Sequence, residues 1–252
     1  MLYNRTHINP EPESVAESVA RLIVSKVKQK ESTSEHFNLA ISGGNTPNIL
    51  FDLLANEFAG QIDWNTLRIF WVDERCVDPT DKESNYGNAH KILLKNVPMP
   101  PENIFNIRGD NDPSAEAMRY REVLKKVLPE KDGFPVFDLI LLGMGDDGHT
   151  ASIFPDNLEL IHTAETVEVA VHPHSGQHRI TLTGNVICNA KQVVFLITGD
   201  SKAEILESIL NEKGDFERFP AYYILSGCEA ELYLDYEAAE RLQDKDFFWQ
   251  GI

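Results

Sequence analysis

The stretch FNLAISGGNTPNILFDLL, residues 37–54, decides the fold. Its first five residues form a short apolar run that predicts a buried strand, and Ser42-Gly43-Gly44 ends that run abruptly. Thr46 is the expected N-cap of a following helix and Pro47 lies in its expected first turn, because hydroxyl side chains and proline are both favoured at helix starts. Apolar residues then recur at helical spacing, at Ile49, Leu50, Leu53 and Leu54. The stretch therefore predicts a strand, a glycine loop and a helix.

The same alternation of strand and helix extends on both sides of this unit. Apolar residues recur at helical spacing upstream, from Val15 to Val27. Downstream, the pattern predicts helices over 83–94 and after Asp112-Pro113, and strands over 67–72, 138–142, 179–183, 192–198 and 230–234. Residues 98–112 read as a loop. We expect one α/β domain over residues 1–252, with a largely parallel sheet covered by helices on both faces.

Composition narrows the range of partners and compartments. The net charge of −17 disfavours nucleic acid and anionic membrane, which bind mainly through Lys and Arg, but a pocket of a few cations can still hold a small phosphate. No apolar run is long enough to span a membrane, and residues 1–10 lack the features of a signal peptide, so we expect a cytoplasmic protein. Three cysteines without a C-x-x-C pair predict neither a disulfide framework nor a cysteine zinc site.

The glycine loop is a candidate anion site. Ligands of open α/β sheets bind beyond the carboxyl ends of the strands, which is where Ser42, Gly43, Gly44 and Thr46 lie. Small residues before a helix let backbone N–H groups and the helix dipole converge on a phosphate. The alternative is a tight turn without a ligand. Neither the P-loop pattern nor the dinucleotide G-x-G-x-x-G is present, which disfavours nucleotides.

A second polar loop, GMGDDGHT at residues 143–150, follows the apolar strand 138–142. Asp147 or a nearby carbonyl can fix the tautomer of His149, which leaves the other imidazole nitrogen free to act as a general base. The alternative is a glycine-rich turn with a structural histidine. We expect Asp147 and His149 to form the catalytic pair, and the four polar segments that follow strands to meet at one edge of the sheet.

Other chemistries fit these residues less well. A metal site at Asp146, Asp147 and His149 is disfavoured because no H-E-x-x-H and no second histidine at ligand spacing are present. A hydroxyl nucleophile such as Ser42 or Ser152 lacks a G-x-S-x-G elbow, so water is the expected attacking group. The histidine-rich stretch at residues 171–179 contains His172, His174 and His178. It is expected to be an exposed loop, and no role is assigned to these histidines.

Three cations are candidates for holding a phosphate. Arg75, Arg179 and Lys202 each lie at the end of an expected strand or the start of the next helix. Their position near the glycine loop favours this role over surface ion pairs, which the 40 acidic residues would also permit. Asp73 and Glu74 are expected to orient Arg75.

In combination these segments resemble the 6-phosphogluconolactonase family. The motifs are S-G-G-N-T-P at 42–47, W-V-D-E-R at 71–75, E-S-N-Y-G at 83–87, G-M-G-D-D-G-H-T-A-S-I-F-P at 143–155, R-I-T-L-T at 179–183 and G-D-S-K at 199–202. The resemblance implies the fold of sugar-phosphate isomerases and deaminases, a NagB-like and Rossmann-like α/β fold. It also implies hydrolysis of 6-phosphogluconolactone, a step of the oxidative pentose phosphate route, with His149 activating water and the cations and glycine loop receiving the phosphate.

Two alternatives remain at this point. Related glucosamine-6-phosphate deaminases carry a glutamate in the register where this chain has Phe154, and an apolar ring cannot relay protons. A sugar-phosphate sensor without catalysis is the second alternative, against which the presence of His149 argues. We expect a small sugar-phosphate substrate, no cofactor, and a monomer or weak homo-oligomer.

Overall fold

The computed structural model describes residues 5–33, 35–228 and 230–242 of the expected domain 1–252. A seven-stranded sheet has the order β1-β12-β11-β8-β2-β3-β5, and every neighbouring pair in it is parallel. These strands are β1 (Thr6–Asn9), β2 (Phe37–Ile41), β3 (Leu67–Trp71), β5 (Ile104–Phe105), β8 (Leu139–Leu142), β11 (Val193–Ile197) and β12 (Glu231–Asp235). The expected α/β fold with a largely parallel sheet is confirmed.

A smaller antiparallel sheet lies on one side of the large one. Its order is β4-β10-β9, formed by β4 (Asp73–Arg75), β10 (His178–Leu182) and β9 (Val167–Val171). The chain passes from β3 to β4 through Val72, whose carbonyl accepts a hydrogen bond from the Leu182 amide at 2.7 Å. Arg75 and Arg179 are thereby placed opposite each other on adjacent strands.

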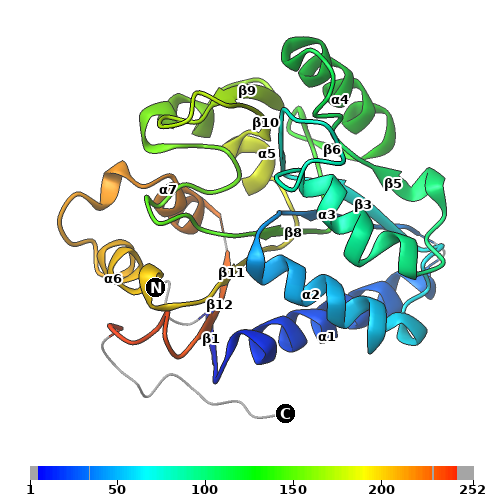
Figure 1. Ribbon diagram of the computed structural model, residues 1–252, viewed down its shortest axis with the longest axis horizontal. Coiled ribbons are helices and arrows are strands. Elements are labelled where there is room, and N and C mark those ends of the chain that lie inside the picture. Colours follow the sequence, from blue (N-terminus) through cyan, green and yellow to red (C-terminus); the bar gives the residue numbers. More distant parts are fainter. Residues whose placement is uncertain (1–4, 34, 229, 243–252) are drawn as a thin grey trace.

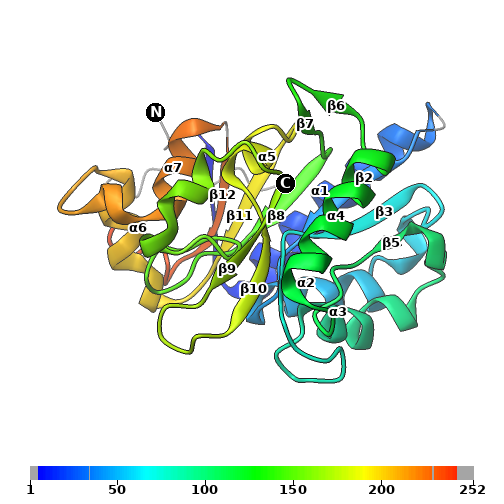
Figure 2. The same ribbon diagram turned by 90° about the horizontal axis from the view of Figure 1, so that it is seen from above.

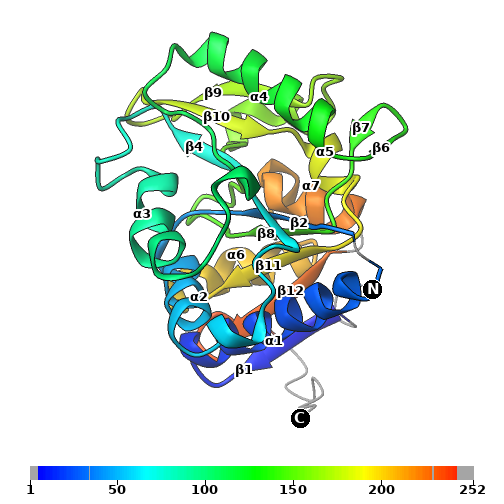
Figure 3. The same cartoon turned by 90° about the vertical axis from the view of Figure 1, so that its right-hand side faces the viewer.

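Helices complete the layers (Figures 1 and 2). In Figure 3, α1 and α2 lie on one face of the seven-stranded sheet, whereas β4, β9, β10 and α4 lie on the opposite side. The α-helices are α1 (Pro12–Glu31), α2 (Asn45–Asn56), α3 (Asn85–Ile92), α4 (Pro113–Val127), α5 (Gly184–Cys188), α6 (Ala203–Leu210) and α7 (Pro220–Gly227). A short hairpin joins β6 (Glu130–Lys131) to β7 (Phe134–Pro135). None of the helices in the described part of the chain is long and apolar enough to cross a membrane.

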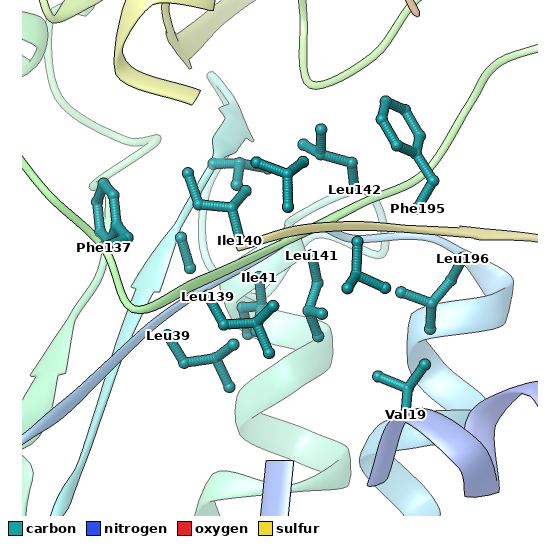
Figure 4. Close-up of a cluster of buried hydrophobic side chains, with 14 of the residues drawn as sticks. Val19, Leu39, Ile41, Phe137, Leu139, Ile140, Leu141, Leu142, Phe195 and Leu196 are labelled. Carbon is teal, nitrogen blue, oxygen red and sulfur yellow. The ribbon is translucent and has the colours of Figure 1, made fainter. Parts of the chain in front are cut away.

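The central strand β8 shows why the sequence selects this layering. All four of its residues are buried, and in Figure 4 Leu139 and Leu141 point to the side of Val19 from α1, whereas Ile140 and Leu142 point to the other side. Alternate residues of a strand face opposite ways, so a run that is apolar at every position requires cover on both faces. Full burial of each such side chain contributes about 1.5–3 kcal/mol.

Three expectations about the fold were wrong. The expected strand 179–183 is present as β10, but it lies in the antiparallel sheet and not in the parallel one, and its alternation of polar and apolar residues is typical of antiparallel strands. The expected loop 98–112 contains β5, which adds an edge strand to β3. Thr46 is not the N-cap of α2, because the helix begins at Asn45 and Gly44 occupies the cap position.

Candidate active site

The polar segments that follow the strands meet in one cleft of about 530 Å³. Its wall is contributed by the segments after β2, β3, β8 and β11, which agrees with the position of ligand sites in open α/β sheets. Every binding residue predicted from the sequence lines this cleft, and so does His149. Asp147 contacts the Nδ1 atom of His149. The cleft lining therefore includes Ser42, Gly43, Gly44, Thr46, Arg75, His149, Arg179 and Lys202.

The Ser42–Pro47 loop presents a helix start without a side-chain cap. Gly44 has φ +122°, in the region that favours glycine, and no side chain caps the first amides of α2, so these amides are available to an anion. Gly43 is also required, because a Cβ there would lie 1.8 Å from Oδ1 of Asn85. The hydroxyl of Ser42 donates to the Leu141 carbonyl at 2.8 Å, so it ties β2 to β8 and can offer a ligand only an acceptor.

Thr46 connects this loop to a second one. Its hydroxyl lies 2.7 Å from the hydroxyl of Thr198, which follows β11 and also lines the cleft. The second loop is shaped by Gly199, whose amide donates to the buried carboxylate of Asp235 at 3.0 and 3.1 Å. The loops that follow β2 and β11 are thus held side by side. Lys202 lies in the short helical turn Asp200–Lys202, directly after Gly199.

The loop after β8, residues 143–150, turns back on itself. The Gly145 amide donates to the His149 carbonyl at 2.9 Å, and Gly148 has φ +76°. A Cβ on Gly145 would lie 2.2 Å from the His149 ring and 2.8 Å from Oδ1 of Asp147, so the imidazole packs against a surface that only glycine provides. The side chain of His149 is 31% exposed and therefore is not turned into the protein interior.

Asp147 holds the imidazole by one nitrogen. Its Oδ1 lies 2.5 Å from Nδ1 of His149 and also accepts the His149 amide at 3.1 Å. Burial acts to raise the pKa of Asp147, but the hydrogen bond and charge of His149 outweigh it and lower that pKa to about 2. The carboxylate is therefore ionised over the neutral pH range, and Nε2 is the nitrogen that remains for chemistry.

Two of the three cations lie on adjacent strands. Arg75 and Arg179 are opposite each other in the β4–β10 pair, and the Nε atoms of both are buried and without a hydrogen-bond partner among the described residues. Burial and then the charge of Arg75 lower the pKa of Arg179. Arg75 also donates from Nη1 to the Glu83 carbonyl at 2.5 Å. Two partly buried guanidinium groups in contact with one cleft are well suited to a doubly charged anion.

Lys202 differs from the arginines because it already has a carboxylate partner. Its ammonium pairs with Asp146, whose side chain is 74% exposed. The same carboxylate accepts the Ser201 hydroxyl at 3.1 Å. An anion that binds Lys202 must therefore compete with Asp146.

Asp73 and Glu74 were expected to orient the side chain of Arg75, but neither carboxylate hydrogen-bonds its guanidinium group. Glu74 is buried and accepts the backbone amides of Arg75, Asn85 and Tyr86, each at 2.7 Å, so it fixes the backbone of Arg75 and not its guanidinium. Burial raises the pKa of Glu74 to about 7. Asp73 accepts the Ser152 hydroxyl at 2.7 Å, which leaves that hydroxyl bound to a carboxylate inside the protein.

A family model described as glucosamine-6-phosphate isomerases/6-phosphogluconolactonase matches residues 10–233. The chain belongs to this family. Among its relatives, the 6-phosphogluconolactonase of Treponema pallidum is 42% identical over 197 residues, 78% of this chain and 82% of the relative. That of Haemophilus influenzae is 42% identical over 229 residues, 88% of this chain and 96% of the relative.

Solved structures of the family share the fold. The devB protein superposes with a TM-score of 0.88 at 41% identity, over 94% of this chain and 99% of that one. The 6-phosphogluconolactonase of Trypanosoma brucei has a TM-score of 0.81 at 30% identity, over 94% and 98%. A monomeric glucosamine-6-phosphate deaminase of the NagB superfamily, at 21% identity and a TM-score of 0.75 over 94% and 99%, shows the common architecture alone.

In this member of the family, Phe154 is fully buried and its ring centroid lies 4.9 Å from that of His149. The imidazole is thus held between a carboxylate and an aromatic ring. No group of three or more His, Cys, Asp or Glu side chains in residues 5–33, 35–228 and 230–242 is arranged to hold a metal ion.

Several residues of the cleft were missed by the sequence reasoning. Asn85 lies within the quoted E-S-N-Y-G motif, and its position beside Gly43 follows only from the packing of α3 against α2. Thr198 and Ser201 line the cleft as well, and both precede the predicted Lys202 in the chain. His172 was assigned no role, although it lines the cleft, because the loop before β10 gave no sign of folding back over the site.

Proposed function

We propose that the chain hydrolyses 6-phospho-D-glucono-1,5-lactone to 6-phosphogluconate, with His149 as the general base. The observation that carries the proposal is the shared cleft, in which the imidazole and the phosphate-compatible loop 42–47 face the same space. The names and coverage of the relatives support the same activity. The expected cytoplasmic location and the monomeric or weakly oligomeric state stay predictions.

Phosphate binding is assigned to the α2 start and the three cations. The free amides at the N-terminus of this 12-residue helix and the guanidinium groups of Arg75 and Arg179 offer donors in fixed directions. Lys202 adds a point charge once Asp146 releases it. Binding energy from the non-reacting phosphate then positions the lactone carbonyl near His149.

The chemical step uses one base and water. Nε2 of His149 takes a proton from water while the water oxygen adds to the lactone carbonyl carbon, which gives a tetrahedral oxyanion. As the oxyanion collapses, the bond between this carbon and the ring oxygen breaks, and the imidazolium returns its proton to that oxygen. Asp147 holds Nδ1 and stabilises the transient positive charge on the ring. The reaction balances without a cofactor.

Phe154 argues against the deaminase alternative. Phe154, whose ring packs against the His149 ring, is apolar and cannot pass a proton to or from the imidazole. A base supported only by Asp147 is sufficient for water activation, which needs no second relay group.

Proton release from freshly prepared 6-phosphogluconolactone tests the proposal. A weakly buffered stopped-flow assay with a pH indicator is expected to show release faster than spontaneous hydrolysis, measured in parallel without protein. Ammonia release from glucosamine-6-phosphate is expected to be absent. Proton release at the background rate would support the sensor alternative, and ammonia release would support the deaminase.

A further inference from the structure

The proposed reaction requires a donor for the oxyanion, and His172 occupies a suitable place. This residue directly follows β9 and lines the cleft together with His149 and Arg179. Its side chain is only partly exposed, whereas His174 in the same loop is exposed. His172 is therefore the histidine of this loop that a bound substrate can contact.

Hydrogen bonds within the loop define the tautomer of His172. Its Nδ1 accepts the backbone amides of His174 at 3.3 Å and Ser175 at 3.2 Å. An imidazole nitrogen that accepts N–H groups carries no proton, so in the neutral ring the proton resides on Nε2. None of the described residues hydrogen-bonds this Nε2. The Nε2–H group of His172 is therefore available to donate a hydrogen bond to a ligand.

The surroundings favour the neutral ring. Burial lowers the pKa of His172, and the positive charge of Arg179 lowers it further. A neutral imidazole with Nδ1 already occupied can act toward a ligand only as a donor, which matches a carbonyl oxygen, and it cannot accept the O–H of a sugar hydroxyl.

Phe154 places this donor close to the base. The His172 ring contacts Phe154 edge-on at a centroid distance of 5.1 Å, and the His149 ring contacts the same Phe154 ring at 4.9 Å. Because Phe154 is fully buried, it is a rigid spacer between the two imidazoles. The base and the free donor thus border one part of the cleft.

We propose that Nε2–H of His172 donates a hydrogen bond to the lactone carbonyl oxygen, which strengthens as that oxygen becomes the tetrahedral oxyanion. This inference rests on the proposed lactone hydrolysis, whose phosphate site employs the three cations and leaves the oxyanion without an assigned donor. A neutral preorganised donor stabilises the charge that develops in the transition state more than it stabilises the substrate.

Two substitutions at one position separate donation to substrate from support of the loop. The side-chain oxygen of His172→Asn is placed to take over the role of Nδ1 in the loop, but the variant has no group at the position of Nε2. The amide of His172→Gln reaches the position of Nε2 and gives up the contacts of Nδ1. We expect His172→Asn to lower kcat about 10²-fold with little change in KM, and His172→Gln to retain most of the activity.

His174→Ala is the matched control, because it removes an exposed imidazole from the same loop and keeps the backbone amide that His172 accepts. It is expected to leave kcat unchanged. The affinity for 6-phosphogluconate, measured by calorimetry, should differ little between His172→Asn and the unsubstituted protein, since the contact gains strength only in the transition state.

Several outcomes would overturn the assignment. Full activity of His172→Asn would exclude a donor role, and so would a larger loss in His172→Gln than in His172→Asn, which would indicate loop support. A raised KM at unchanged kcat would place the contact in the ground state and not at the oxyanion. An unsubstituted chain that does not accelerate lactone hydrolysis would reject the proposed function and His172 with it, whereas the other results concern His172 alone.

Discussion

The two sides of the cleft, the loop after β8 and the group formed by the α2 start and the cations, differ in how many residues carry their proposed chemistry. The catalytic loop after β8 concentrates its chemistry in one contact, between Asp147 and His149, and packs this pair against Gly145. The proposed phosphate side distributes its contacts over the α2 start and cations from three separate segments. In the proposed mechanism a single atom accepts the proton, whereas several groups share the charge of the phosphate.

This difference predicts how each side responds to substitution. Loss of the only base removes a step of the reaction, so it should lower kcat. Loss of one of several phosphate contacts leaves the others in place, so it should raise KM and leave kcat largely intact. The comparison fails if substitutions on the two sides change the same kinetic constant.

His149→Ala is expected to have the largest effect. Removal of a general base costs about 10²–10⁴ in turnover, and KM should change little because the phosphate contacts remain. Initial rates of proton release give both constants. His90→Ala, which removes an exposed histidine of α3, is the control and should behave as the unsubstituted protein. Undiminished turnover without the imidazole would refute the mechanism.

Gly145→Ala tests whether packing of the catalytic loop positions the base. The added methyl carbon would lie 2.2 Å from the His149 ring, so the imidazole must move, and a displacement of about 1 Å can cost about 10² in kcat. Gly60→Ala is the matched control, since no atom lies within 4 Å of a Cβ at that remote position. Equal activity of the two variants would show that the loop tolerates a shift of the ring.

Arg179→Ala tests the phosphate side of the cleft, where several groups are proposed to share the binding. A charge-assisted hydrogen bond contributes about 1.5–3 kcal/mol, which corresponds to a rise in KM of about 10- to 150-fold. The relief of repulsion from Arg75, its neighbour in the β4–β10 pair, favours the lower end of this range. Steady-state kinetics with the lactone, together with inhibition by inorganic phosphate, measure the effect. A fall in kcat at constant KM would move Arg179 to the reacting end of the substrate.

The fold and most of the site could be predicted because their determinants are local. The run at Leu139–Leu142 requires burial on both faces, and the polar loops that follow such strands meet at one edge of a parallel sheet. The convergence of His149 with the glycine loop follows from this rule. The start of α2 was misplaced by two positions, with Thr46 expected as the N-cap where the structure has Gly44, because Gly44 adopts a conformation that local propensities do not reveal.

What could not be predicted depends on contacts distant in sequence. The pairing of Arg75 with Arg179 requires the chain to leave the large sheet at Val72 and join β10, about a hundred residues later. The position of His172 depends on a loop held by its own backbone hydrogen bonds. Neither arrangement has a periodic signal, because each is set by tertiary packing and not by local propensity.

Asp147→Asn tests the electrostatic part of the catalytic pair through stability. The pKa of Asp147 falls from 3.8 to about 2 on folding, so its ionised form stabilises the fold above pH 3.8, and this contribution is lost as the pH falls through about 2. The unsubstituted protein should therefore exceed the variant in unfolding free energy above pH 3.8, and the gap should close at lower pH. The gap is expected to be about 1 kcal/mol or less because the carboxylate is 35% exposed. Urea unfolding at several pH values measures it, and a gap that does not depend on pH would rule out the charge as its source.

Asp146→Asn has the smallest expected effect and the opposite sign on KM. Asp146 is exposed and neutralises Lys202, so a phosphate that binds this ammonium must displace the carboxylate. Exposed ion pairs contribute about 0.2–1 kcal/mol, so removing the competing charge should lower KM by about fivefold at most while kcat stays constant. The double variant Asp146→Asn with Lys202→Ala separates the explanations, because it should show no such gain if Lys202 is the group released. A gain that persists without Lys202 would mean that Asp146 repels the substrate directly, and the phosphate side would then depend on the arginines and the α2 amides alone.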